Sequence, residues 1–128
     1  MPSDWNAPGR MTIDGEGGVT TVRVSGNFHR DLAPTERDAL EAQLRGAGDA
    51  HCLVVDLTDL VRLDSWGEEV IAEVVDDVVT QRLRAAIVFD EVRPHHVRSL
   101  RVLLKRHGTA VRFGCDAAEL RRWVTEAP

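Results

Sequence analysis

The chain has 128 residues, which is enough for one domain with a buried core and too few for two of ordinary size. Its content of 43% hydrophobic and 29% charged residues is typical of a globular protein and excludes a disordered or fibrous one. The net charge of −5 argues against nonspecific binding of nucleic acid by the whole molecule. No apolar stretch is long enough to cross a bilayer and the N-terminus lacks the features of a signal peptide, so we expect a cytoplasmic protein with no membrane partner.

The cysteines and histidines form no pattern that indicates a metal site. Cys52 and Cys115 are far apart in the chain, and a cysteine in a strand of a cytoplasmic protein is usually a small buried hydrophobe. The histidines are scattered apart from the neighbours His95 and His96, and none has the spacing of zinc ligands. We therefore expect neither a metal nor a cofactor.

The N-terminal part of the chain predicts an arm followed by a hairpin. Residues 1–10 contain two prolines and a glycine with little periodicity, so we interpret them as a flexible arm before a domain over residues 11–128. Two strands, 11–14 and 19–25, flank a glycine-rich turn. We expect the second strand to end at Gly26-Asn27.

The rest of the chain alternates between helices and strands. The predicted elements, in chain order, are a helix from Pro34 to about Gly46–Gly48, a strand at 52–57, a helix at 65–81, a strand at 85–89, a helix from Pro94 to Gly108, a strand at 110–113 and a terminal helix capped by Asp116. Apolar residues at helical spacing predict which side chains are buried: Leu40, Leu44, Ala47, Val70, Ile71, Val74, Val75, Val78, Val79, Val97, Leu100, Leu103, Leu104, Leu120, Trp123 and Val124.

The order β-β-α-β-α-β-α-β-α predicts an α/β fold. Strands separated by helices favour right-handed crossovers and a mostly parallel sheet, and the N-terminal hairpin supplies its antiparallel edge.

Residues 53–67 are the most informative segment. An apolar run at 53–55 predicts a buried strand, and a short loop then leads to a helix that begins at Asp64-Ser65. Glu68 lies three residues after Ser65, which is the spacing of a capping box. Ser65 therefore either caps the helix or presents a hydroxyl where an added phosphate would be tolerated by the helix dipole.

Charge is distributed unevenly along the second half of the chain. Six acidic residues and no Lys or Arg lie between Arg62 and Arg82, whereas six basic residues and no acid lie between Val92 and Cys115. These stretches are either solvated helix faces that pair with one another or two docking faces of opposite sign. The basic helix lacks the interleaved aromatic residues of a single-strand binder, so we expect no nucleic-acid partner.

Catalytic motifs are absent from the sequence. There is no Gly-x-Ser-x-Gly elbow, no phosphate-binding loop and no dinucleotide fingerprint. No histidine is placed by the sequence to activate Ser65. We therefore expect a protein that is not an enzyme.

The strand at 55–57 and the turn Leu63-Asp64-Ser65-Trp66-Gly67 resemble the strand and Asp-Ser-x-Gly turn of STAS domains, the bacterial anti-sigma factor antagonist family. The resemblance extends over nearly the whole chain, and Gly26 matches a glycine at the end of that family's second strand. It implies that a serine kinase of the ATP-binding, histidine-kinase-like class, often the anti-sigma factor itself, phosphorylates Ser65. Asp64 would orient the turn, and Gly67 would let a partner approach it closely.

Several positions depart from the family's pattern. Asn27 and His29 stand where an acidic pair is usual, Glu68 and Glu69 replace aliphatic residues that meet the partner, and Trp66 replaces a small residue. The two carboxylates should oppose a phosphate on the neighbouring serine. The tryptophan either packs on its own domain, screens the serine from a kinase, or anchors a different partner.

Three functional hypotheses follow from these residues. In the first, the domain binds an anti-sigma factor through the turn and is released by phosphorylation of Ser65. In the second, it is an interaction module without a phosphoswitch, either oligomeric or similar to the stressosome scaffold members that the segment at 92–94 and His107-Gly108 resemble. In the third, His29 and Asp31 bind a small ligand or act in catalysis.

Overall fold

The computed structural model describes residues 9–47 and 51–126, and over these residues it confirms the predicted α/β class. The strands are β1 (Arg10–Glu16), β2 (Val19–Phe28), β3 (Cys52–Asp56), β4 (Leu60–Leu63), β5 (Ala85–Val88) and β6 (Val111–Gly114). The helices are α1 (Pro34–Ala47), α2 (Ser65–Thr80), α3 (Arg98–Leu104) and α4 (Ala117–Thr125), with 3-10 segments at Pro94–Val97 and Lys105–Ala110.

The strands form one mixed sheet in the order β1-β2-β3-β5-β6, and β4 pairs separately with β2. The pair β1–β2 is antiparallel and every other pair is parallel, as predicted. Gly17 and Gly18 close the hairpin with φ of 59° and 78°, which is the left-handed conformation that glycine adopts without strain. The predicted arm at residues 1–10 lies mainly outside the described residues, and its last residue, Arg10, already pairs with Ser25.

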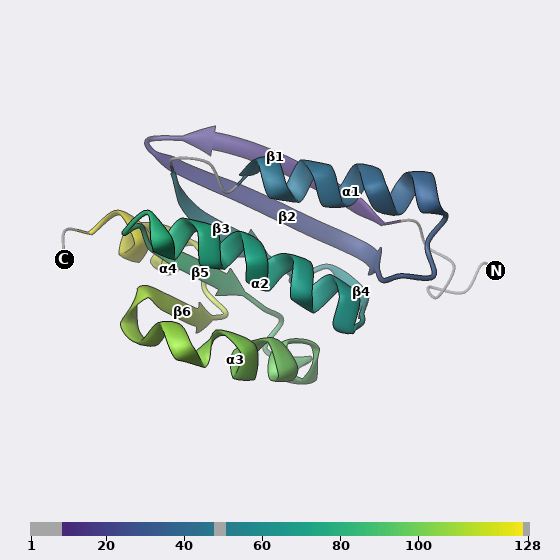
Figure 1. Ribbon diagram of the computed structural model, residues 1–128. Helices are drawn as coiled ribbons and strands as arrows, with labels where there is room; N and C mark the ends of the chain where they lie inside the picture. The colour runs from purple at the N-terminus through teal and green to yellow at the C-terminus, as the bar shows by residue number, and fades with distance from the viewer. Residues whose placement is uncertain (1–8, 48–50, 127–128) are drawn as a thin grey trace.

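Helices cover both faces of the sheet, because the side chains of a strand alternate between them. Figure 1 shows α1, α2 and α3 in front of the sheet and α4 behind it. Leu53, Val55 and Ile87 pack in the larger cluster with the front helices. Val54 and Ala86 pack in the smaller cluster with α4. This two-sided burial explains why the central strands are continuous apolar runs.

The prediction of a loop between the 52–57 strand and α2 is wrong. Residues 60–63 form β4, which pairs in parallel with the end of β2 at Phe28. The prediction that β2 ends at Gly26-Asn27 is wrong for the same reason, because β2 passes through an irregularity there and continues to Phe28. A four-residue strand that depends on a distant partner gives no periodic signal of its own.

Two helical predictions also differ from the structure. The helix expected from Pro94 to Gly108 is a short α-helix, α3, between two 3-10 segments. Leu103 was expected to be buried but is 36% exposed, whereas Leu100 and Leu104 are buried as predicted. At the end of α1, Gly46 does not stop the helix, which continues to Ala47; Gly48 lies outside the described residues.

Candidate functional site

Ser65 is the first residue of α2 and is exposed, at the edge of the sheet where the parallel strands end. The capping-box prediction for Ser65 and Glu68 is wrong, because the N-cap is Asp64. Asp64 has an extended backbone (φ −105°, ψ −178°), and its Oδ1 accepts a hydrogen bond from the backbone N–H of Gly67 at 3.0 Å. The Ser65 hydroxyl is therefore not needed to cap the helix.

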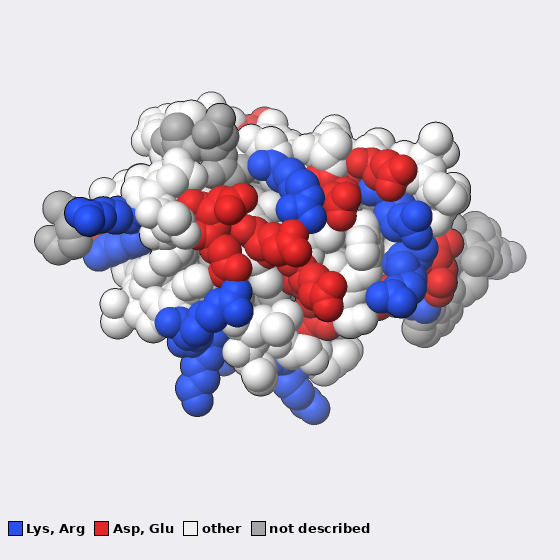
Figure 2. Space-filling view, in the orientation of Figure 1, with Lys and Arg blue, Asp and Glu red and all other residues white. Residues whose placement is uncertain are grey.

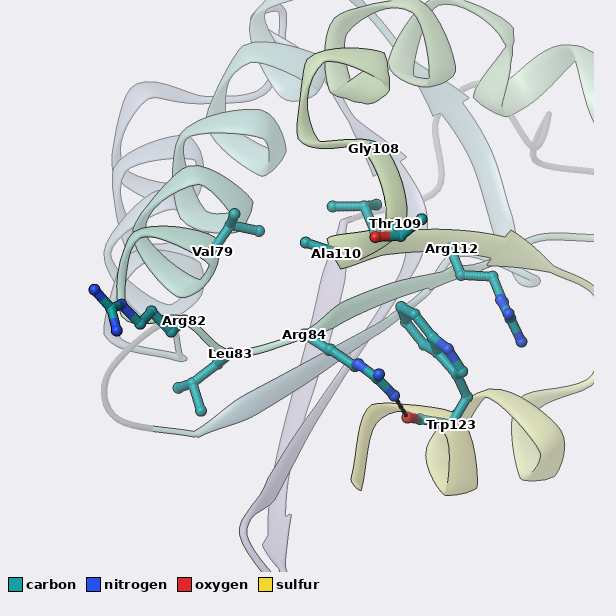
Figure 3. A pocket seen from close by; sticks show the side chains of 10 residues that line it. Val79, Arg82, Leu83, Arg84, Gly108, Thr109, Ala110, Arg112 and Trp123 are labelled. Atoms are coloured by element: carbon teal, nitrogen blue, oxygen red, sulfur yellow. Dashed lines mark hydrogen bonds between the residues drawn. The ribbon is translucent and has the colours of Figure 1, made fainter. Parts of the chain in front are cut away.

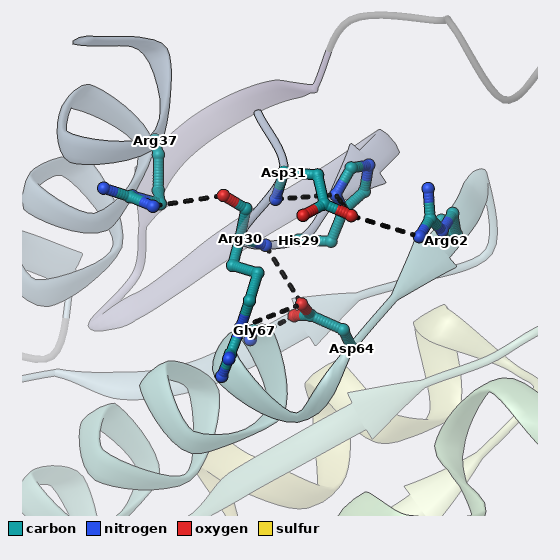
Figure 4. A network of polar contacts seen from close by, with 7 residues as sticks. All are labelled: His29, Arg30, Asp31, Arg37, Arg62, Asp64 and Gly67. Carbon is teal, nitrogen blue, oxygen red and sulfur yellow. Dashed lines mark hydrogen bonds and ion pairs between the residues drawn. The ribbon is translucent and has the colours of Figure 1, made fainter. Parts of the chain in front are cut away.

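Asp64 also binds the loop that follows β2. Its Oδ2 accepts a hydrogen bond from the backbone N–H of Arg30 at 3.0 Å and lies 3.7 Å from Nε of the same residue (Figure 4). Both oxygens of one carboxylate are thus used, one inside the helix and one across to the loop. The position of the Ser65 turn relative to this loop depends on that side chain.

Gly67 is buried against the domain itself, which gives this glycine a structural role that the resemblance did not imply. A Cβ at this position would lie 2.6 Å from Cδ1 of both Leu63 and Phe28, and 2.7 Å from the carbonyl oxygen of Phe28. Glycine is required because the first turn of α2 lies directly on the end of β2. The close approach that the structure shows is between two segments of this chain.

Trp66 is half-buried and packs on Phe28. The ring centroids are 5.0 Å apart with an angle of 25° between the planes, which is a stacked arrangement. Of the three expected roles, packing on its own domain is the one observed. Ser65 stays exposed beside the indole, so Trp66 does not cover the hydroxyl.

Asn27 and His29 are 1% and 5% exposed, so neither presents a side chain to the surface. Nδ1 of His29 accepts a hydrogen bond from the backbone N–H of Asp31 at 3.1 Å. The carboxylate of Asp31 lies 3.5 Å from Nη2 of Arg62 on β4 (Figure 4). His29, Asp31 and Arg62 thus hold the loop after β2 in place.

Ser65 lines a groove between α2 and α3 with a volume of about 390 Å³. Ser65, Glu68 and Glu69 form the wall on α2. The wall on α3 consists of Ser99, Val102 and Leu103. Val102 is 72% exposed, an unusual position for a large aliphatic side chain with no role in the core. We call this feature the Ser65 groove.

Sequence reasoning did not find the α3 wall of the Ser65 groove. The signal was present, because Val102 cannot share the buried stripe of a helix that already buries Leu100 and Leu104. The spacing therefore places Val102 outside the stripe, as an exposed apolar side chain.

The acidic face of α2 is partly paired and partly free. Asp76 accepts a hydrogen bond from Nη2 of Arg106 at 2.6 Å and a second one from His107. Burial raises the pKa of Asp76, but these hydrogen bonds outweigh it and hold the pKa below its usual range. Glu69 and Asp77 form no ion pair among the described residues. Figure 2 shows the acidic side chains gathered over α2, with basic ones beside them.

Glu68 is half-buried and has a raised pKa. The main cause is burial, and the nearby charge of Asp64 adds to it. The start of α2 therefore carries three carboxylates close to Ser65, at positions 64, 68 and 69. Arg30 is the basic side chain that lies against this cluster, through its contact with Asp64.

Within the described residues, no group of three or more His, Cys, Asp or Glu side chains could hold a metal ion. None of the helices in this part of the chain is both long and apolar enough to cross a membrane.

No family model matches the sequence, and a comparison with curated proteins gives no match. Solved structures do match. An anti-sigma factor antagonist from Mycobacterium paratuberculosis has a TM-score of 0.72 at 21% identity, over 92% of this chain and 95% of that chain. The chain has the STAS fold. The anti-sigma factor antagonist SpoIIAA in its unphosphorylated form has a TM-score of 0.58 at 12% identity, over 89% of this chain and 94% of that chain.

Within this STAS fold, the predicted site residues divide into two groups. Ser65, Glu68 and Glu69 line the groove, so they meet at one surface. Asp64, Trp66 and Gly67 join the turn to β2 and the loop after it, whereas Asn27 and His29 are buried at the end of β2.

Proposed function

We propose that the chain is a bacterial, cytoplasmic regulator of the anti-sigma factor antagonist type, that it binds a serine-kinase anti-sigma factor at the Ser65 groove, and that phosphorylation of Ser65 ends the complex. The observation that carries the proposal is an exposed serine that does not cap its helix and that lines a groove at the start of α2. The regulator works by docking and has no catalytic role of its own.

Phosphorylation of Ser65 would change the electrostatics of the groove. A phosphate carries a charge of about −1.5 to −2 and would stand near the carboxylates of Asp64, Glu68 and Glu69. The N-terminus of α2 compensates part of that charge, and in the free protein solvent screens the rest. A partner that covers the groove removes the solvent, so the modified complex has to bury uncompensated charge and dissociates.

The two walls of the groove define the chemistry of the partner. Val102 and Leu103 offer apolar surface, which suits an aliphatic or aromatic anchor. Glu69, on the opposite wall, has no ion pair with any described residue, which suits a lysine or arginine next to that anchor. The proposed contact segment of the anti-sigma factor is therefore apolar with an adjoining basic residue.

The test is to mix the full chain with a panel of ATP-binding anti-sigma kinases and to measure binding by calorimetry and modification by mass spectrometry. At least one kinase should bind the wild type and Ser65→Ala equally, bind Ser65→Asp at least tenfold more weakly, and with ATP add one phosphate at Ser65. Ala118→Asp is the matched control, because it adds the same charge to the exposed first turn of α4, behind the sheet. It should bind like the wild type.

The carboxylates beside Ser65 also favour a second candidate, a docking module without a phosphoswitch, either oligomeric or part of a scaffold. Negative charge next to the hydroxyl makes both the phosphorylated state and its formation less favourable. In that case a complex forms, no phosphate appears at Ser65, and Ser65→Asp binds as tightly as Ser65→Ala. That result would reject the switch and keep the docking surface.

A further inference from the structure

A second hollow lies at the opposite end of the parallel strands from the Ser65 groove, where β5 and β6 begin. It has a volume of about 670 Å³ and lies between the C-terminal ends of α2 and α4. Its walls include Leu83, Val111 and the side chains of Arg82, Arg84 and Arg112 (Figure 3). None of the described residues that line it is acidic. The Ser65 groove has no residue in common with this hollow.

Arg84 is half-buried and held in one orientation. Its Nη1 donates a hydrogen bond to the carbonyl oxygen of Trp123 at 2.8 Å, and its guanidinium carbon lies 4.9 Å from the centroid of the Trp123 ring. A guanidinium has five N–H donors, and this is the one bond to a protein acceptor that Arg84 makes among the described residues. Within the described residues its remaining donors have no acceptor, so a ligand can use them without the cost of ordering the side chain.

Two further arginines lie on either side of Arg84. The guanidinium carbon of Arg112 is 4.7 Å from the centroid of the Trp123 ring, and Figure 3 shows the indole between Arg84 and Arg112. Arg82 stands at the rim on the other side, where its exposed side chain extends outward. Neither Arg82 nor Arg112 forms an ion pair with a carboxylate in the described part of the chain.

The backbone of Arg82 gives a second indication. Arg82 is the non-glycine residue with a positive φ among the described residues, at 64°. It follows the C-cap of α2, where the backbone N–H groups of Arg82 and Leu83 bond to the carbonyls of Val79 and Val78. This is a Schellman motif, and glycine is the usual residue at the left-handed position. An arginine there is strained, and it adds a positive charge at the mouth of the hollow.

The charges around the hollow do not cancel. The C-terminal ends of α2 and α4 each contribute about −0.5 elementary charge, against three guanidinium groups of +1, which leaves about +2 for the described lining and about +1 when the adjacent Glu126 is counted. Glu126 lines a neighbouring hollow with Arg82 and Arg84, and it forms no ion pair with either. A positively charged hollow in a chain with a net charge of −5 is a local feature, not an effect of composition.

We infer that this hollow binds a small molecule that carries a phosphate group. Guanidinium groups match the oxygens of phosphate in pairs, and Arg84 is already oriented for such a contact. Arg82 at the rim and Arg112 beyond the indole add positive charge around the hollow, which attracts the anion. The volume exceeds that of a phosphate ion, and the apolar walls contact the organic part of the ligand.

The test is a titration of the full chain with phenyl phosphate, inorganic phosphate and phenol at constant ionic strength, followed by the amide and indole N–H resonances in NMR spectra. Phenyl phosphate should give saturable shifts at Arg84, Arg112 and the Trp123 indole, with higher affinity than inorganic phosphate. Phenol, which has no charge, should give no saturable shifts at these residues. Absence of saturable shifts up to millimolar concentration, or shifts confined to the Ser65 groove, would overturn the inference.

Two variants separate binding from folding. Arg112→Gln should weaken binding about tenfold, because it removes a charged donor from an exposed side chain. Arg82→Gly should also weaken binding while the protein becomes equally or more resistant to denaturation, because glycine relieves the strained backbone. Arg122→Gln, on an exposed position of α4 outside the hollow, should bind like the wild type. If Arg112→Gln and Arg82→Gly bind phenyl phosphate as tightly as Arg122→Gln and the wild type do, the site is rejected.

Discussion

Asp64 and Arg30 join the start of α2 to the loop after β2. The carboxylate oxygen Oδ2 of Asp64 is 3.0 Å from the backbone nitrogen of Arg30, while Oδ1 caps the helix at Gly67. The two residues are 34 positions apart in the chain, so this contact is tertiary. It makes the residue before Ser65 both a helix cap and the link that positions the turn.

Substitution of Asp64 should lower the free energy of unfolding more than substitution of an N-cap that makes no contact outside its own helix. Asp64→Ala removes an N-cap, worth about 1 kcal/mol, and a loop hydrogen bond of about the same value, so the free energy of unfolding should fall by about 2 kcal/mol. Asp116→Ala is the matched control, because Asp116 caps α4 through Glu119 alone and should cost about 1 kcal/mol. Urea unfolding measures both. Equal losses would contradict a second structural role for Asp64.

Gly67→Ala should destabilise the protein by about 1–3 kcal/mol, because its Cβ would overlap the carbonyl of Phe28 and cannot be accommodated without moving α2. Gly46→Ala is the opposite case. None of the described residues has an atom within 4 Å of a Cβ at Gly46, which is in α1, so alanine should raise stability by about 0.5–1 kcal/mol. Denaturation midpoints of the two variants should therefore move in opposite directions, and a downward shift in both would argue against this packing.

The ion pairs of Asp76 should contribute to stability in a pH-dependent way. Its pKa in the folded state is below the ordinary value of about 4, so the contribution is complete above that value and is lost as the pH falls through the folded pKa. Asp76→Asn should lower the free energy of unfolding by about 0.5–1 kcal/mol at neutral pH, since the pair is largely exposed to solvent. The difference from the wild type should disappear once the pH is below the lowered pKa of Asp76 in the folded state.

Asp77→Asn is the control for this pH profile. Asp77 is the next residue on α2, it is exposed, and it forms no ion pair in the described part of the chain. Its substitution should leave stability unchanged within about 0.5 kcal/mol at neutral pH. A profile for Asp77→Asn that matches the one for Asp76→Asn would show that net charge, and not the contact with Arg106, causes the effect.

Val102→Asp should weaken the proposed anti-sigma factor complex at least tenfold, because it places a charge on the apolar wall of the Ser65 groove. Its own stability should change by no more than about 0.5 kcal/mol, since the side chain is 72% exposed. Val92→Asp is the matched control, at 79% exposure and outside the groove. Calorimetry with the kinase that binds the wild type measures the difference, and equal affinities would place the contact elsewhere.

The sequence alone determined the elements whose signals are local. The helix over 65–80, the Asp116 cap and the buried Leu120 and Trp123 follow from spacing that is complete within one segment. The order of helices and strands and the serine at the start of α2 could also be recognised from the sequence alone. Periodicity and capping need only neighbouring residues, so they can be recognised without knowledge of the fold.

Only the tertiary structure decided what each residue near Ser65 contacts. β4 exists because β2 continues past Gly26 to pair with it, and Gly67 is required because α2 lies on Phe28. The Ser65 groove brings α2 together with Val102, which lies more than 30 positions along the chain. Such contacts depend on the path of the backbone between distant segments, and local spacing does not encode that path.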